Sequence, residues 1–72
     1  MELKKWTRER YTVEERPDGL NGLSWFAIME GGEVADYIYP GSHWDQVRII
    51  DALDAGEDVN GWDNGAGNPV KI

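Results

Sequence analysis

The first half of the chain shows the alternation of hydrophobic and polar residues that is typical of β-strands. Residues 6–15 predict one strand, because aromatic and β-branched residues recur among charged ones. Residues 23–30 are apolar on both alternating faces, which predicts a central strand covered on both sides. Residues 34–39 predict the return strand. Gly31 and Gly32 between them fit a two-residue hairpin turn that needs positive φ.

The second half of the chain predicts one helix, from residue 43 to about residue 55. Ser42 is typical of an N-cap, with Asp45 three residues later as an approximate capping box. Gly56 is well placed as the left-handed residue that follows the helix. At about 100° per residue, the apolar side chains fall on one side and predict the stripe that faces the core. They are Val47, Ile49, Ile50 and Leu53.

Beyond the helix, Gly and Asn dominate residues 56–69, which predicts a loop with a tight turn at Asn64-Gly65. Residues 70–72 are a candidate for a short fourth strand at the edge of the sheet. The predicted fold is therefore α+β: a three-stranded antiparallel sheet packed with one α-helix, in a single small acidic domain over residues 1–72. Aromatic residues are expected to enrich the sheet face opposite the helix: Trp25, Tyr37 and Tyr39.

Size and composition narrow the classes of function. A chain of 72 residues makes one domain that buries only about 60% of its unfolded surface, so a deep, well-supported pocket is hard to build. A hydrophobic fraction of 40% with four Trp, three Tyr and one Phe argues against disorder. The absence of Cys excludes disulfides and thiolate metal sites. With neither a signal-type segment nor a long apolar run, we expect a soluble protein without membrane contact.

The charge of the chain is strongly uneven. Fourteen Asp and Glu oppose seven Lys and Arg, for a formal net charge of -7. Residues 1–16 carry five bases and four acids, whereas residues 17–72 carry two bases and ten acids. Such a polarised field steers encounters with basic partners and repels nucleic acid.

Three acids are regularly spaced at the end of the predicted helix. Asp51, Asp54 and Asp58 follow a spacing of three and then four residues, which places helical neighbours ~5–6 Å apart. Successive phosphates of one nucleic-acid strand have a comparable separation, so such a row can occupy Lys and Arg sites meant for nucleic acid. Acids at a helix C-terminus oppose the macrodipole by ~0.3–1 kcal/mol each. Acids kept at this position despite the cost indicate that their charge is used to bind a partner. The alternative is that they serve only solubility.

Trp44 falls on the polar side of the predicted helix, beside Arg48 and Asp51. An exposed Trp among charges is the composition of an interface hot spot. The alternative is that the N-terminal segment, with Trp6, folds over it. The residues expected to bind a partner are Trp44, Asp45, Asp51, Asp54, Glu57, Asp58 and Asp63.

We expect no catalytic residues and no bound cofactor or metal. Ser42, His43 and Asp45 are neighbours in sequence, but side chains at consecutive helix-start positions diverge, so capping is the preferred interpretation. Counted from Asp58, positions 5 and 12 of a calcium loop are Trp62 and Pro69, which departs from the EF-hand pattern. An enzyme or metal-binding domain stays open as an alternative.

The N-terminal segment offers a small basic and aromatic surface for nucleic acid. Its bases and rings are Lys4, Lys5, Arg8, Arg10, Trp6 and Tyr11. Four Glu residues within the first sixteen positions dilute that surface, so we expect no direct binding of nucleic acid. The alternative role of these bases is to pair across strands with the acids.

In its size, its charge and its acidic segment 45–58, the chain resembles anti-CRISPR proteins, which are small acidic phage-encoded inhibitors of CRISPR–Cas complexes. The resemblance is one of class, because these proteins share no common motif. It implies a DNA mimic that binds a basic nucleic-acid-binding protein, a Cas subunit, in the cytoplasm of the bacterial host. The alternative is a protein–protein interaction module of phage or bacterial origin without mimicry, monomeric or weakly homodimeric through a sheet edge or Trp44.

Overall fold

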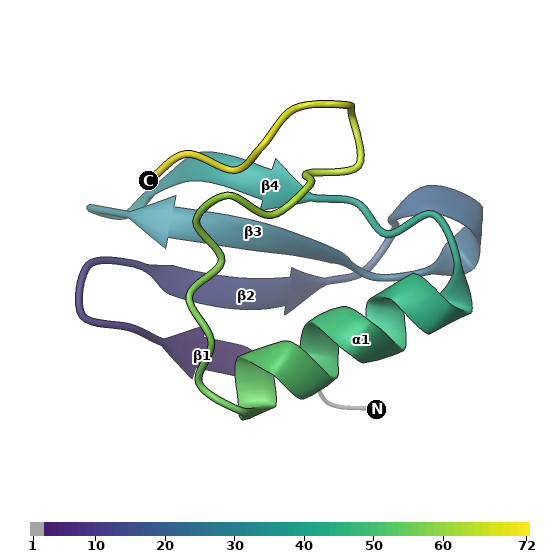
Figure 1. The fold of residues 1–72 in the computed structure, drawn as a ribbon, viewed down its shortest axis with the longest axis horizontal. Helices are drawn as coiled ribbons and strands as arrows, with labels where there is room; N and C mark the ends of the chain where they lie inside the picture. The colour runs from purple at the N-terminus through teal and green to yellow at the C-terminus, as the bar shows by residue number, and fades with distance from the viewer. Residues whose placement is uncertain (1–2) are drawn as a thin grey trace.

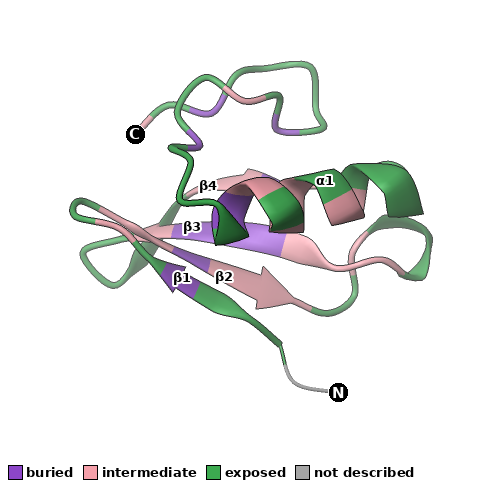
Figure 2. Cartoon of the chain, turned by 60° about the horizontal axis from the view of Figure 1, so that its bottom comes forward, coloured by how far each residue is buried: buried purple, intermediate pink, exposed green. Residues whose placement is uncertain are grey.

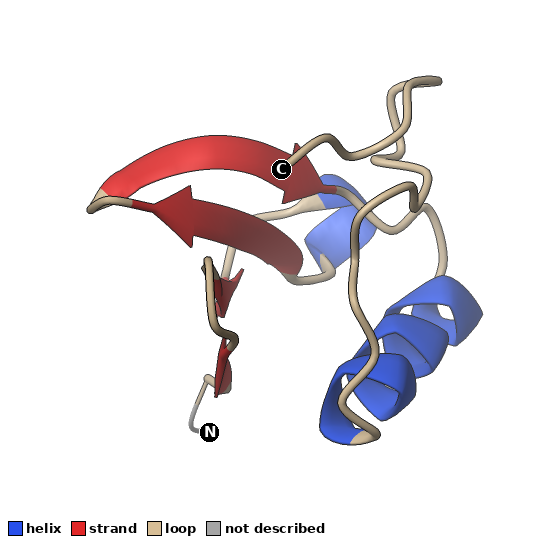
Figure 3. Ribbon diagram, turned by 60° about the vertical axis from the view of Figure 1, so that its left-hand side comes forward, coloured by secondary structure: helices blue, strands red, loops and turns tan. Residues whose placement is uncertain are grey.

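The structure is a computed structural model that describes residues 3–72 of the chain. One antiparallel sheet of four strands, in the order β1-β2-β3-β4, carries a helix on one face (Figures 1 and 3). The predicted α+β class, with one antiparallel sheet and one helix, is confirmed. The elements are β1 (Lys5–Thr7), β2 (Thr12–Arg16), the short 3-10 turn η1 (Leu20–Gly22), β3 (Trp25–Glu30), β4 (Glu33–Ile38) and α1 (His43–Asp54).

The prediction of a single strand over residues 6–15 is wrong, because this segment forms the hairpin of β1 and β2. The chain reverses where the Arg8 amide donates to the Tyr11 carbonyl at 2.8 Å. Trp6 and Val13 pair directly across the ladder, and both point into the core. One continuous strand would have placed them on opposite faces, since their separation of seven residues is odd. The turn contains neither Gly nor Pro, so no local signal marked it.

The fourth strand therefore comes from the N-terminal segment, and residues 70–72 form no strand. The Val70 amide donates to the Trp62 carbonyl at 2.7 Å, and the Gly61 amide donates to the Val70 carbonyl at 2.9 Å. The C-terminal residues thus pair with their own loop, where Asp63 and Pro69 form an isolated bridge. Residues 56–72 run from the end of α1 across to β4 (Figure 1).

The central hairpin and the covered strand are confirmed. Gly31 and Gly32 join β3 to β4 with φ values of 62° and 85°, in the left-handed region that the predicted turn requires. Phe26, Ala27 and Ile28 on β3 are all fully buried, so both faces of this strand are covered (Figure 2).

The helix begins and ends as its caps predict. The Ser42 hydroxyl accepts a hydrogen bond from the Asp45 amide at 3.2 Å, and Gly56 adopts a φ of 87° just beyond the helix. Leu53 is fully buried, and the helix turns this side toward the sheet. Ile49 and Ile50 pack against the core. The remaining residue of the predicted stripe, Val47, is half-buried and lies outside that cluster.

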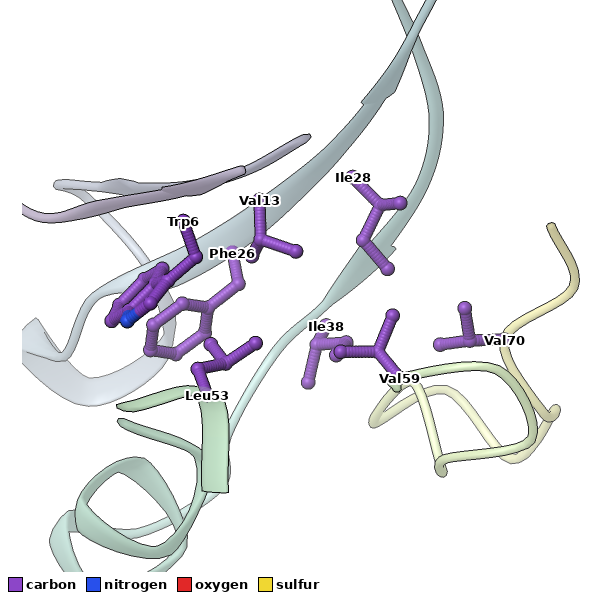
Figure 4. Packing of buried hydrophobic residues seen from close by; sticks show 8 residues of the cluster. All are labelled: Trp6, Val13, Phe26, Ile28, Ile38, Leu53, Val59 and Val70. Carbon is purple, nitrogen blue, oxygen red and sulfur yellow. The ribbon is translucent and has the colours of Figure 1, made fainter. Parts of the chain in front are cut away.

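The core joins the sheet, the helix and the C-terminal loop. Val59 and Val70, two isolated valines among Gly and Asn, are buried against Ile38 and its neighbours (Figure 4). The loop therefore forms part of the hydrophobic core, a contribution that its composition did not indicate. The buried cluster consists of Trp6, Val13, Phe26, Ile28, Ile38, Leu53, Val59 and Val70.

Aromatic side chains cover the opposite face of the sheet, as expected. Trp25 stacks on Tyr39 with ring centroids 5.3 Å apart, and Tyr37 meets Tyr39 edge-on at 5.0 Å. The Arg16 guanidinium lies 5.8 Å from the centroid of the Trp25 ring. Ala27 points to this face and is fully buried in the layer.

Candidate functional site

The N-terminal bases are used to hold β1 against the C-terminal end of α1. Lys4 Nζ forms an ion pair with Asp54 Oδ2 at 3.0 Å, and Trp6 Nε1 donates to Asp54 Oδ1 at 2.8 Å. Arg8 Nη2 donates to the carbonyls of Leu53 at 2.8 Å and Glu57 at 3.2 Å. A guanidinium here satisfies helix carbonyls that lack a partner and complements the negative end of the macrodipole. The hydrogen bond from Trp6, and next the one from Lys4, lower the pKa of Asp54.

Asp58 holds the beginning of the C-terminal loop. Its Oδ1 accepts from the Tyr11 hydroxyl at 2.8 Å and from the Asn60 amide at 3.0 Å. The Tyr11 hydroxyl in turn accepts from the Val59 amide at 3.1 Å. The hydrogen bond from Asn60, followed by that from Tyr11, lowers the pKa of Asp58. Burial is the main cause that raises the pKa of Tyr11.

The three acids of the predicted row, Asp51, Asp54 and Asp58, are all exposed, but they are not equivalent. Asp54 and Asp58 are both engaged in the fold, and α1 ends at Asp54, so Asp58 does not share a helical face with Asp51. At the helix C-terminus, Lys4 pairs with the carboxylate of Asp54, and Arg8 binds the backbone carbonyls. The unfavourable charge of Asp54 at this helix end is therefore offset within the chain, whereas Asp51 has no such partner within residues 3–72.

The same contacts engage four of the six side chains of the basic and aromatic N-terminal surface, while Lys5 and Arg10 stay exposed. Lys4 and Arg8 are bound to α1, Trp6 lies in the core, and Tyr11 is bonded to Asp58. This arrangement differs from the alternative of pairing across strands, because Lys4 pairs with Asp54 of α1 and Arg8 binds backbone carbonyls. Sequence reasoning gave none of them its actual role, because the contacts span 45 to 50 residues.

Four of the predicted partner-binding acids remain directed to solvent. Within residues 3–72, the carboxylates of Asp45, Asp51 and Glu57 make no hydrogen bond or ion pair. Asp63 is also exposed, and its Oδ1 accepts only from the Gly65 amide at 2.9 Å in a local turn. These four residues therefore add to the negative field on this side of the molecule without a base among the described residues to pair with them.

Trp44 is the most exposed large hydrophobic residue of the described chain, with 74% of its surface accessible. Its ring meets that of His43 edge-on, with centroids 6.0 Å apart. Trp6 lies in the core, so the alternative in which the N-terminal segment covers Trp44 is wrong. The outer side of α1, which carries Trp44, faces solvent (Figure 2).

A groove of about 500 Å³ lies between α1, the end of β4 and the C-terminal loop. Asp45, Glu57 and Asp63 contribute acids to its lining, and Arg48 contributes the base. Trp62, half-buried against the core, was not predicted to belong to a site. The remaining lining residues are Ile38, Tyr39, Pro40, Gly41, Ile49, Ala52 and Gly65.

The loop wall of this groove is fixed to the sheet by backbone contacts. The Tyr39 amide donates to the Asn64 carbonyl at 3.0 Å. Asn64 is buried, and its Oδ1 accepts from the amides of Ala66 at 2.8 Å and Asn68 at 3.3 Å. Gly65 lies so close to Tyr39 that a Cβ would stand 2.1 Å from the Tyr39 carbonyl oxygen. The groove is thus a preformed part of the fold.

The residues considered for catalysis or metal binding do not assemble into a site in the described part of the chain. Ser42 serves as the helix cap, and among the hydrogen bonds of residues 3–72 none joins His43 to Ser42 or Asp45. No group of three or more His, Asp or Glu side chains in this range is arranged to hold a metal ion.

Comparison of the chain with protein-family models, with curated proteins and with solved structures gives no match. At twelve residues, α1 is too short to span a bilayer, and residues 3–72 contain no other helix that could do so.

Proposed function

We propose that the protein binds a basic nucleic-acid-binding protein and blocks its DNA site by charge mimicry. The observation that carries the proposal is the exposed Trp44 on a helix face whose carboxylates have no partner within residues 3–72. Trp44 and Asp51 are seven residues apart, so they lie about two turns apart along one side of α1. An aromatic anchor beside solvated acids supplies both burial and electrostatic steering.

The acidic surface of this proposal differs from the predicted one. It comprises Asp45, Asp51, Glu57 and Asp63 around Trp44 and the groove, because Asp54 and Asp58 are engaged in the fold. Each exposed ion pair with a partner contributes only ~0–1 kcal/mol, so affinity depends on several acids together with the Trp anchor. A Cas subunit is the partner that the likeness in size and charge to anti-CRISPR proteins suggests.

The test is competition with DNA for purified nucleic-acid-binding proteins, including Cas effector complexes. Labelled DNA should be displaced by the parent protein and much less by a double Asp51→Lys, Glu57→Lys variant. The matched control is Glu30→Lys, Glu33→Lys, which changes the charge equally at the exposed β3–β4 turn. If the parent displaces no DNA, or if both double variants compete equally, the proposal fails.

A second candidate is a protein–protein interaction module without mimicry. It is favoured by the half-buried aromatic layer of Trp25, Tyr37 and Tyr39 on the sheet face that carries no helix (Figure 3). Binding through this layer would bury aromatic surface and respond weakly to salt. Partner binding that survives the Asp51→Lys, Glu57→Lys change but is lost on Tyr37→Ser would select this candidate.

A further inference from the structure

The groove between α1 and the C-terminal loop has the features of a small binding site. Its volume of about 500 Å³ lies within the range of ligand pockets, ~300–1,000 Å³. Its walls come from three separate parts of the chain: the end of β4, one side of α1, and the loop around Trp62. The loop wall is held to Tyr39 by a backbone hydrogen bond of 3.0 Å, so little ordering is needed on binding.

The floor of the groove is apolar. Ile38 is buried there, and Ile49 and Trp62 are half-buried. The side chain of Ala52 is a single methyl group, so it leaves space on the helix side of the groove. An indole flanked by aliphatic side chains suits a flat group attached to a methylene chain.

The charges on the lining select the sign of the occupant. Asp45, Glu57 and Asp63 provide three carboxylates against the single guanidinium of Arg48. Within residues 3–72, Arg48 forms no ion pair with any of these acids, so their field is not neutralised in place. Charge complementarity therefore favours a cationic group over an anionic one.

We infer that this groove binds an arginine side chain presented by a partner protein. The guanidinium would stack against Trp62 and pair with Glu57 or Asp63, and its methylenes would cover Ile49 and Ala52. The guanidinium is planar and always charged, so it can stack on the indole ring and also pair with a carboxylate. The compact ammonium of lysine does both less well. The inference rests on the proposed function, since it specifies which chemistry of a basic partner the acidic side of the molecule recognises.

Arg48 leads to a prediction in which a substitution strengthens binding. As the only base on the lining, it repels an incoming guanidinium. Its replacement by Gln should therefore strengthen binding of an arginine peptide. An occupant of the opposite charge, held by Arg48, would instead be weakened by the same change.

The experiment titrates the full chain with the capped peptide Gly-Ala-Arg-Ala-Gly and with the same peptide carrying citrulline, the neutral isostere of arginine. Backbone and indole N–H chemical shifts are followed by NMR. We expect the arginine peptide to shift Ala52, Gly65 and the Trp62 indole. The citrulline peptide should bind up to about fivefold more weakly, as the loss of one exposed charge pair allows. Equal binding of the two peptides, or shifts elsewhere only, would overturn the inference.

Three variants complete the test. Glu57→Lys changes the groove lining and should weaken binding by about tenfold or more, whereas Asp51→Lys makes the same charge change on a residue outside the lining and should weaken it far less. Ala52→Leu fills the floor without changing charge and should also abolish the shifts, with its fold checked by the dispersion of the remaining peaks. Equal losses in the two Lys variants would indicate general charge attraction and reject the groove.

The outcomes separate this inference from the proposed function. Displacement of DNA by the parent protein together with no arginine binding in the groove rejects the groove and leaves the proposed function standing. Arginine binding in the groove without displacement of DNA from any tested protein rejects charge mimicry and leaves an arginine-recognising module.

Discussion

At the scale of single residues, the acids of this chain divide into two groups by what they contact. Asp54 accepts from Lys4 and from the Trp6 indole, and so joins the N-terminal strand to the helix end. The carboxylate of Asp51, three residues earlier, makes no hydrogen bond or ion pair within residues 3–72. Position on the helix thus decides whether an Asp is structural or available to a partner.

Asp54→Ala should lower the thermal unfolding midpoint clearly, because the indole N–H of Trp6, a largely buried residue, would lose its acceptor. Asp51→Ala, which removes a solvated carboxylate of the same type, should leave the midpoint nearly unchanged. Melting curves by circular dichroism compare the two. Equal midpoints for both variants would show that the Trp6 hydrogen bond contributes nothing to stability.

The lowered pKa values of Asp54 and Asp58 predict how stability depends on acid. A carboxyl whose pKa is lower in the folded than in the unfolded state contributes stability that is full above its ordinary pKa, about 4. That contribution is lost as the pH falls through the folded pKa. Urea unfolding should therefore show a loss of unfolding free energy as the pH falls below about 4, and this loss should be smaller in an Asp54→Asn, Asp58→Asn variant. The same loss in both proteins would assign the acid sensitivity to other groups.

At the scale of elements, the helix is fixed to the sheet by one fully buried side chain. Leu53 is the deepest residue of α1, whereas Val47 on the same helix is only half-buried. Leu53→Ala should cost ~2–5 kcal/mol of unfolding free energy, from lost burial and the cavity left behind. Val47→Ala should cost distinctly less. Chemical denaturation measures both, and comparable costs would contradict this account of the packing.

The C-terminal loop is an element of the core without being a helix or strand. Gly65 and Gly67 both have a left-handed φ, of 84° and 88°, but only Gly65 packs against the Tyr39 backbone, whereas Gly67 faces open space. Gly67→Ala should therefore cost only the strain of positive φ, ~1–3 kcal/mol. Gly65→Ala should cost more, because the loop must also move away from β4. Equal stabilities in denaturant would mean that the loop is not held there.

At the scale of the whole molecule, the solvated acids and the engaged bases lie on different segments of the chain. Lys4 and Arg8 near the N-terminus are engaged with the end of α1, and the four solvated acids lie on α1 and the C-terminal loop. Association with a basic partner should therefore slow steeply as salt rises from 0.05 to 0.5 M (order-of-magnitude limits), because the Debye length falls from roughly 14 to 4 Å. Stopped-flow rates for the parent and for the Glu30→Lys, Glu33→Lys control measure this. A salt-independent rate would exclude electrostatic steering.

Much of the fold followed from local pattern, because the forces that specify it act between near neighbours. The Gly31-Gly32 turn, the Ser42 cap and the Gly56 helix end each depend on backbone conformations available to few residue types. The hairpin at residues 8–11 has no such residue. Its position is decided by Trp6 and Val13, which must share the buried face of the sheet.

The candidate site was predictable only in part. The exposure of Trp44 followed from helical phase, since it lies opposite Leu53 and its neighbours. Which acids remain available did not follow, because Asp54 and Asp58 meet their partners across 47 to 50 residues of chain. The groove depended on Trp62 and Gly65 reaching α1 and β4, a contact between distant segments.

The sequence by itself therefore determined the α+β class, the helix with its caps, the tight turn and the acidic excess, all of which depend on composition or on residues within one or two turns of each other. The tertiary structure alone decided that Arg8 caps α1, that Val59 and Val70 complete the core, and that Asp45, Glu57 and Asp63 line one groove. The partners of charged and isolated apolar residues are distant in sequence, so these contacts form only when the chain adopts its tertiary structure.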